Sequence, residues 1–156
     1  MPNIEPQDKP RVLLAVHSLL QKQQFDDALP ILENLLADDP NCAASLNFMG
    51  YIYLSVGKEQ VAYQYFRRAL QEEPNNKAVW SNFGMSAYEL NRDQEALNSF
   101  MKAASIDHDY SPAYSNAAAV LVRQSRWEEG KKSAEMSLEC DPSDKNASMN
   151  LAHCYL

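Results

Sequence analysis

The sequence predicts an all-α solenoid, a linear stack of antiparallel helix pairs. The first observation is a 34-residue period that runs along the 156-residue chain, with several columns of residues repeating in register. Such a repeat determines the architecture before any single residue is considered. The second observation is the helical spacing of apolar residues within each repeat, and the third is a proline that ends most repeats. Together they predict four helix pairs and the first helix of a fifth.

Three kinds of column define this repeat. An acid followed by proline ends each repeat, with histidine in one slot: Asp39-Pro40, Glu73-Pro74, Asp107-His108 and Asp141-Pro142. One column in the first helices is mostly glycine or alanine: Val16, Gly50, Gly84, Ala118 and Ala152. The second helices carry two further columns. One holds small residues, Ala28, Ala62, Ala96 and Gly130, and the other holds mostly bulky residues, Leu32, Phe66, Phe100 and Ala134. Glycine at a helix-interior position indicates that two helices approach closely there.

The helix boundaries follow from the breakers between these runs. The residue before each proline leaves the helical region, and Gly57 and Asn91 tolerate the left-handed conformation that ends a first helix. The prolines Pro2, Pro6 and Pro10 predict an extended tail over residues 1–8. We therefore expect a single domain over residues 9–156. Its helices are expected at residues 10–22, 26–38, 43–56, 60–72, 77–90, 94–106, 111–124, 128–140 and 145–156.

Taken in order, the repeats differ in how completely they carry these landmarks. The first, about residues 9–42, keeps Ala28, Leu32 and Pro40 behind a plain aliphatic first helix. The second, 43–76, carries Leu46, Met49-Gly50, Tyr53, Ala62, Phe66, Ala69 and Pro74. The third, 77–110, carries Trp80, Phe83-Gly84, Ala96, Phe100 and Ala103. The fourth, 111–144, is looser, with Tyr114, Ala117-Ala118, Gly130 and Ala134, and 145–156 begins a fifth.

These landmarks resemble the tetratricopeptide repeat family over nearly the whole chain. The resemblance implies a right-handed superhelix in which the first helices line a concave groove and the second helices form the convex back. It predicts a fold more than a function, because this fold serves many unrelated partners.

Composition excludes several classes of function. A net charge of −7 and a pI near 4.9 argue against nucleic acid or an anionic membrane as a partner. Three cysteines without paired spacing predict reduced thiols and a cytoplasmic protein. The histidines His17, His108 and His153 belong to different repeats, and all four glycines fall on repeat columns. We therefore expect no catalytic residue, cofactor or metal site.

Three asparagines that do not belong to the packing columns are the main functional candidates. Asn82, Asn116 and Asn150 recur at 34 residues, each two residues before the small-residue column. An asparagine amide both donates and accepts, so one per repeat could hold every third peptide unit of an extended chain. The column resembles the asparagine ladder in the repeats of O-linked N-acetylglucosamine transferase. The alternative is structural: each amide bonds the neighbouring helix.

Helical spacing directs further side chains to the same predicted surface. Phe48 interrupts the ladder in the second repeat and joins Tyr51, Met85 and Tyr88 in an aromatic, adaptable patch suited to apolar anchors. The predicted peptide-binding set is Asn47, Phe48, Tyr51, Asn82, Met85, Tyr88, Asn116, Arg123 and Asn150. Asn47, Ser81 and Ser115 stand where binders of acidic chaperone C-termini would need lysine, which disfavours that partner class.

The end of the sequence adds a further expectation. Leu151, Tyr155 and Leu156 continue the packing pattern without a second helix, which suggests a fragment of a longer chain or self-association through this edge. We expect a non-enzymatic scaffold that binds an extended peptide or partner segment in its groove. One alternative is the substrate-docking part of a larger enzyme such as a glycosyltransferase, and another is a free-standing secretion chaperone.

Overall fold

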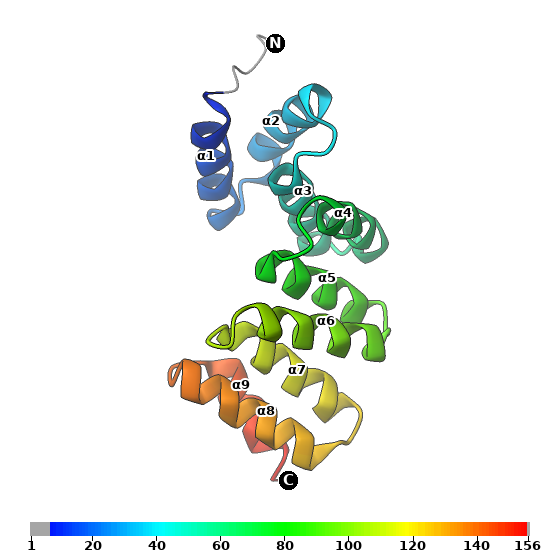
Figure 1. The fold of residues 1–156 in the computed structure, drawn as a ribbon, viewed down its shortest axis with the longest axis vertical. Helices are drawn as coiled ribbons and strands as arrows, with labels where there is room; N and C mark the ends of the chain where they lie inside the picture. Colours follow the sequence, from blue (N-terminus) through cyan, green and yellow to red (C-terminus); the bar gives the residue numbers. More distant parts are fainter. Residues whose placement is uncertain (1–6, 156) are drawn as a thin grey trace. The chain divides into compact units, whose positions relative to one another are not determined.

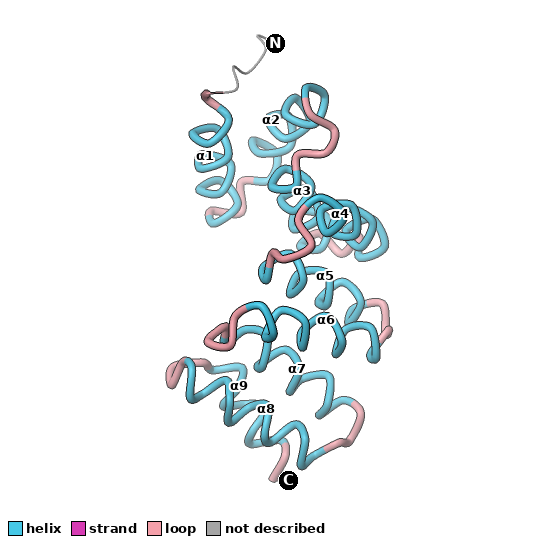
Figure 2. The backbone as a smooth tube through the Cα atoms, viewed as in Figure 1, coloured by secondary structure: helices cyan, strands magenta, loops and turns pink. Residues whose placement is uncertain are grey.

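Helices and short loops make up the structure, a computed structural model that describes residues 7–155. Within this range nine helices form and no strand does, so the predicted all-α class is confirmed (Figures 1 and 2). Most of the predicted tail, residues 1–6, and Leu156 lie outside the described residues. None of the helices in the described range combines the length and the apolar run that a bilayer crossing needs.

The helices lie where the repeat predicts them, within one or two residues at almost every boundary. They are α1 (Lys9–Gln21), α2 (Phe25–Asp38), α3 (Ala43–Ser55), α4 (Glu59–Glu72), α5 (Lys77–Glu89), α6 (Asp93–Ile106), α7 (Ser111–Arg123), α8 (Trp127–Cys140) and α9 (Lys145–His153). The exception is the last helix, predicted to reach residue 156. It ends at His153, where the N–H of Cys154 is shared between the carbonyls of Asn150 and Leu151 and the N–H of Tyr155 bonds only the carbonyl of Ala152, three residues back.

One backbone conformation ends the first helix of each complete pair. Gln23, Gly57, Asn91 and Ser125, spaced at 34 residues, have φ of 57°, 71°, 58° and 58°. The N–H of the residue that follows each of them bonds a carbonyl five residues back, as from Lys58 to Tyr53 at 2.8 Å. This is the geometry of a Schellman end, and it confirms the prediction for Gly57 and Asn91.

The helices form two compact units, which divide between Pro74 and Asn75. In the first unit α3 packs most closely on α4, and Val16, Leu20, Leu32, Leu35, Met49 and Ile52 form a buried cluster. In the second unit α5 packs on α6 and α7 on α8, while α7 also contacts α5, α6 and α9. Each unit thus buries a stripe of every helix, as the repeat requires.

A glycine against a phenylalanine sets the distance within two of the pairs. A Cβ on Gly50 would lie 2.6 Å from the ring of Phe66, and one on Gly84 would lie 2.7 Å from the ring of Phe100. Both rings are fully buried. In the α7/α8 pair the same two columns hold Ala118 and Ala134, both buried, whose side chains together are smaller than one phenylalanine. The predicted close approach at Gly50 and Gly84 is confirmed.

We expect Gly84→Ala to destabilise the protein by roughly 1–3 kcal/mol, although alanine favours helix by about 1 kcal/mol. The added methyl group would overlap a ring that has no free space. Gly130→Ala is the matched control, because its Cβ would meet the Cys154 sulfur at 3.3 Å near the end of the described chain. Thermal unfolding of both variants measures the effect. An equal change in the two would contradict a specific glycine–phenylalanine contact.

Candidate functional site

The first-helix surface of the second unit, formed by α5, α7 and α9, carries most of the predicted binding residues. Helix α7 lies between the other two and contacts both. The residues on this surface are Asn82, Met85 and Tyr88 of α5, Asn116 and Arg123 of α7, and Asn150 of α9. Asn47, Phe48 and Tyr51 belong to α3 in the first unit and are described separately.

The asparagine amides reach back to the preceding first helix. The Asn150 amide, only 6% exposed, donates to the backbone carbonyl of Ser115 at 3.0 Å. The Asn116 amide donates to the hydroxyl of Ser81 at 3.4 Å, near the limit for a hydrogen bond. Both bonds join residues 35 apart. Asn150 therefore acts as a buried link between α9 and α7, whereas Asn116 and Asn82 are half-buried.

Tyr88 and Arg123, both predicted for binding, lie against each other. The Arg123 guanidinium carbon is 3.5 Å from the centre of the Tyr88 ring, and its N–H donates to the Tyr88 carbonyl at 3.0 Å. The guanidinium also forms an ion pair with Asp93 at the start of α6. One face of the tyrosine is thus covered by a cation whose charge is already paired. Apolar contact on this surface is left to the half-buried Met85 and the rest of the Tyr88 ring.

The three candidates on α3 differ in their surroundings. Phe48 packs against the buried cluster of the first unit, and its ring centre lies 6.0 Å from that of His17. Asn47 is half-buried, and Tyr51 is 39% exposed. Phe48 therefore stabilises the fold whatever else it contacts, while Tyr51 has its ring open to solvent.

A buried polar network fixes α9 against α7 and α8. One carboxylate oxygen of Asp144 accepts from the N–H groups of Asn146 and Ala147 and caps the helix. The other is 3.1 Å from the hydroxyl of Ser111 and 2.9 Å from that of Ser137. Each hydroxyl has a single proton, and both can donate to this carboxylate at once. Asp144 thus positions the helix that carries Asn150.

Burial alone would raise the pKa of the Asp144 carboxyl. The hydrogen bonds from Ala147, Ser137 and Ser111, with the nearby Ser115 hydroxyl, outweigh that effect and hold the pKa below its ordinary value. The Ser115 hydroxyl is close enough to the Asp144 carboxylate to lower its pKa. It has no partner within hydrogen-bonding geometry in the described part of the chain. The carboxylate is therefore stabilised in its charged form, chiefly by its cap and the two bonded hydroxyls.

Two features of the structure were not predicted from the sequence. One is the Asp144 network. Its signal was the column Cys42, Asn76, Tyr110 and Asp144, in which only asparagine and aspartate accept the backbone N–H groups of the next helix. The other is a pocket beside Tyr53 and Tyr65 in the first unit. Its signal was an aromatic residue at position 65, where later repeats have Ser99 and Ser133.

The α8/α9 edge exposes several large apolar side chains within residues 127–155. Met149 is 55% exposed and Tyr155 is 67% exposed, and the Lys131 ammonium lies 4.8 Å from the centre of the Tyr155 ring. Leu151 is half-buried. Self-association through this edge stays a prediction.

Comparison with known proteins agrees with the repeat read from the sequence. Two tetratricopeptide repeat models match the chain, one over residues 13–77 and the other over residues 53–121. The chain belongs to the tetratricopeptide repeat family. Solved structures with the same fold include Pseudomonas aeruginosa pilF, at a TM-score of 0.86 and 20% identity over 95% of this chain and 68% of that one.

A second solved structure is the first tetratricopeptide repeat domain of Spaghetti (RPAP3) bound to the HSP90 peptide SRMEEVD. It has a TM-score of 0.70 and 25% identity, and the match covers 72% of this chain and 90% of that one. Among sequence relatives, a STIP1 homolog of Dictyostelium discoideum is 32% identical over 80 residues, which are 51% of this chain. A DnaJ subfamily C member 7 homolog of the same organism is 27% identical over 150 residues, or 86% of this chain.

A third kind of relative is the probable glycosyltransferase SPINDLY of Solanum lycopersicum, 30% identical over 116 residues, or 74% of this chain. The chain spans only 14%, 28% and 12% of the lengths of these three relatives. The likeness is therefore to their repeat segments.

The Asp144 network predicts a characteristic pH dependence of stability. Asp144→Asn should lower the free energy of unfolding by about 1–3 kcal/mol near neutral pH, because bonds to a charged acceptor are lost. Because the folded pKa is depressed, this contribution is complete above the ordinary value of about 3.9. It is lost as the pH falls from there through the folded pKa. The difference between wild type and variant should narrow in the same range.

Urea unfolding at a series of pH values measures this difference. Glu139→Gln on α8 is the matched control, because that exposed carboxylate accepts no hydrogen bond in the described part of the chain. A gap between wild type and Asp144→Asn that widens as the solution becomes acidic would contradict the assignment.

Proposed function

We propose that the first-helix surface of the second unit binds an extended peptide segment of a partner protein through its backbone. The family supports an interaction role, and the Spaghetti domain bound to an HSP90 peptide is a peptide complex at 25% identity. In this proposal Asn116 and Asn82 contact the peptide backbone, and Met85 and Tyr88 contact an apolar side chain. The chain acts as a scaffold and performs no chemistry of its own.

The observation that carries the proposal is that the Asn116 amide is only partly used in hydrogen bonds within the protein. Its amide is half-buried on α7, and the long bond to Ser81 uses one of its two N–H groups. The other N–H and the carbonyl can pair with the acceptor and donor of one peptide unit. The bond to Ser81 also restricts the side-chain rotamer, which reduces the entropy lost when a peptide binds.

The spacing of the helices suits an extended ligand. Packed helices lie about 8–10 Å apart, and an extended chain advances about 3.3 Å per residue. A peptide that crosses α5 and α7 would therefore place every third peptide unit over an asparagine. Such contacts read the backbone and tolerate many side chains, so selectivity would come from the apolar contacts.

The charges on this surface favour a neutral backbone over an acidic C-terminus. Ser81 and Ser115 are buried, and neither carries a charge. The one arginine here, Arg123, is paired with Asp93, and Lys77 at the start of α5 is paired with Asp107. A carboxylate-rich ligand would have to compete with these acids for Arg123 and Lys77.

The second candidate is the substrate-docking segment of a larger glycosyltransferase. It is favoured by the 30% identity to the SPINDLY relative and by the resemblance of the asparagine column to the repeats of a glycosyltransferase. Both candidates use the same surface, and they differ in what is attached to it. Sequencing the full-length transcript decides between them, since the second requires a catalytic domain in the same reading frame.

Two single variants test the peptide proposal. A peptide selected on the wild-type chain from a displayed random library supplies the ligand. Asn116→Ala should weaken its binding about tenfold, through loss of one or two backbone hydrogen bonds, and should change the melting temperature little. Asn150→Ala should instead lower the melting temperature, because its amide is a buried link to Ser115. Calorimetry and thermal unfolding on the same samples measure both quantities.

Asn98→Ala on α6 is the matched control. It removes an exposed asparagine amide from a second helix, where its one partner within residues 7–155 is Gln94. Peptide affinity that stays intact in Asn116→Ala, or that falls equally in Asn98→Ala, would remove Asn116 from the binding site.

A further inference from the structure

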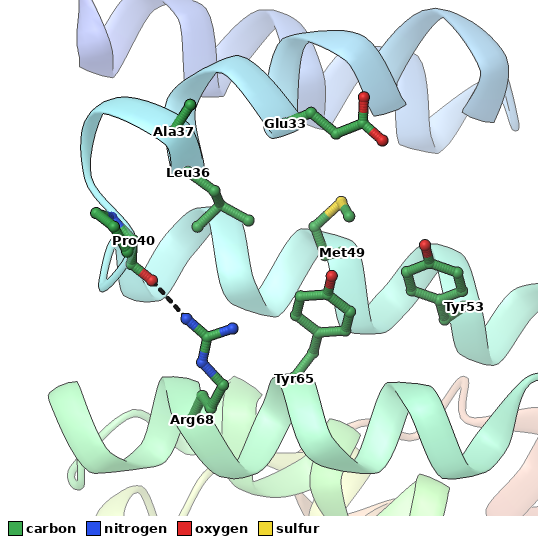
Figure 3. Close-up of a pocket in the computed structure, with 8 residues that line it drawn as sticks. All are labelled: Glu33, Leu36, Ala37, Pro40, Met49, Tyr53, Tyr65 and Arg68. Atoms are coloured by element: carbon green, nitrogen blue, oxygen red, sulfur yellow. Dashed lines mark hydrogen bonds between the residues drawn. The ribbon is translucent and has the colours of Figure 1, made fainter.

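A pocket of about 410 Å³ opens on the second-helix side of the first unit. It lies between α2, α3 and α4, and Figure 3 shows Leu36 pointing into it from α2 and Tyr65 from α4. The buried Met49 and the half-buried Tyr53 of α3 complete its apolar wall. A second hollow of about 290 Å³ lies along α4 and shares Tyr65 and Arg68 with the first. Their lining residues belong to the first unit, and none of them is part of the first-helix surface formed by α5, α7 and α9.

The two tyrosines are peculiar to the second repeat. Their rings are stacked, with centres 5.5 Å apart and planes 9° from parallel. The same two positions hold Leu19 and Ile31, Ala87 and Ser99, and Leu121 and Ser133 in the other repeats. Packing within this fold therefore does not require a tyrosine pair, and the pair leaves a pocket beside it.

Two charged side chains line the pocket, and they differ in whether they have a hydrogen-bond partner. The Arg68 guanidinium donates to the Pro40 carbonyl at 2.7 Å, as the dashed line in Figure 3 marks. Glu33 on α2 is exposed and forms neither an ion pair nor a hydrogen bond within residues 7–155. Burial is the main reason why the pKa of the Tyr65 hydroxyl is raised, with Tyr53 and Glu33 adding to it and Arg68 opposing it. Tyr65 is therefore protonated at neutral pH and can donate a hydrogen bond.

In the second unit, a tyrosine ring and a carboxylate together bind a guanidinium group. There the Arg123 guanidinium lies on the ring of Tyr88 and pairs with the carboxylate of Asp93. At the pocket the Tyr65 ring and an unpaired carboxylate are present together, the Lys58 ammonium lies 5.7 Å from the centre of the Tyr53 ring, and Arg68 is bonded to Pro40. A planar guanidinium can stack on an aromatic ring while it binds a carboxylate through two N–H groups.

We propose that this pocket binds an arginine side chain of a partner protein, with the guanidinium between the Tyr53–Tyr65 pair and the Glu33 carboxylate. The net charge of −7 attracts a basic partner segment at long range. The hollow beyond Tyr65 has room for the residues that flank this arginine, against the exposed Val61. The partner so defined is a basic protein segment, and it is separate from the peptide of the first-helix surface.

Methyl-detected NMR on the full chain tests this proposal. The probe is the peptide Ac-Gly-Arg-Gly-NH2, and its control is the same peptide with citrulline, which keeps the shape of arginine but has no charge. The arginine peptide should shift the Met49 methyl signal saturably, while the exposed Met101 methyl in the second unit stays in place. The citrulline peptide should bind about two- to fivefold more weakly, the effect of one exposed ion pair.

Three variants complete the experiment. Glu33→Gln should abolish the preference for arginine over citrulline, and Tyr65→Ser, which carries the residue of the later repeats, should remove binding of both peptides. Glu139→Gln removes an equal charge from α8 and should leave both affinities unchanged. Equal binding of the two peptides to wild type, a preference that survives Glu33→Gln, or no saturable shift of Met49 would overturn the proposal.

Discussion

The close contact between a first helix and its second helix is the constraint on which the rest of the structure depends. Gly50 and Gly84 leave space that the rings of Phe66 and Phe100 fill completely. This fixes the distance within the α3/α4 and α5/α6 pairs, and the left-handed residue at the end of each complete pair's first helix fixes the turn. Within the second unit, the successive first helices α5, α7 and α9 then present the same side, and a column in the sequence becomes a line of side chains on this surface.

The asparagine column shows how one residue type can serve two purposes on such a line. Asn150 is buried against Ser115, on a helix that Asp144 caps and anchors. Asn116 makes a longer bond to Ser81 and keeps part of its amide near the surface. The same column therefore joins helices at the last repeat and supplies the proposed peptide contacts on α7. The two roles are compatible, because an amide has more hydrogen-bonding groups than a single partner can use.

The sequence predicts the helices well, because their boundaries depend on local features: proline, glycine and the spacing of apolar residues. It does not predict which partner a polar side chain chooses, as at Asp144 and Asn150, since those bonds join residues from different helices. Nor did it reveal that Arg123 covers Tyr88. Gln23 and Ser125 adopt the left-handed conformation without being the usual residues for it, because the repeat around them imposes the turn.

A double-mutant cycle on Gly84 and Phe100 measures the glycine–phenylalanine contact most directly. The free energy of unfolding is compared for wild type, Gly84→Ala, Phe100→Leu and the double variant. If the ring of Phe100 is what excludes a side chain at position 84, the smaller leucine should relieve the overlap. The double variant should then lose less stability than the sum of the two single variants, by roughly 1 kcal/mol or more. Additive losses would contradict the account.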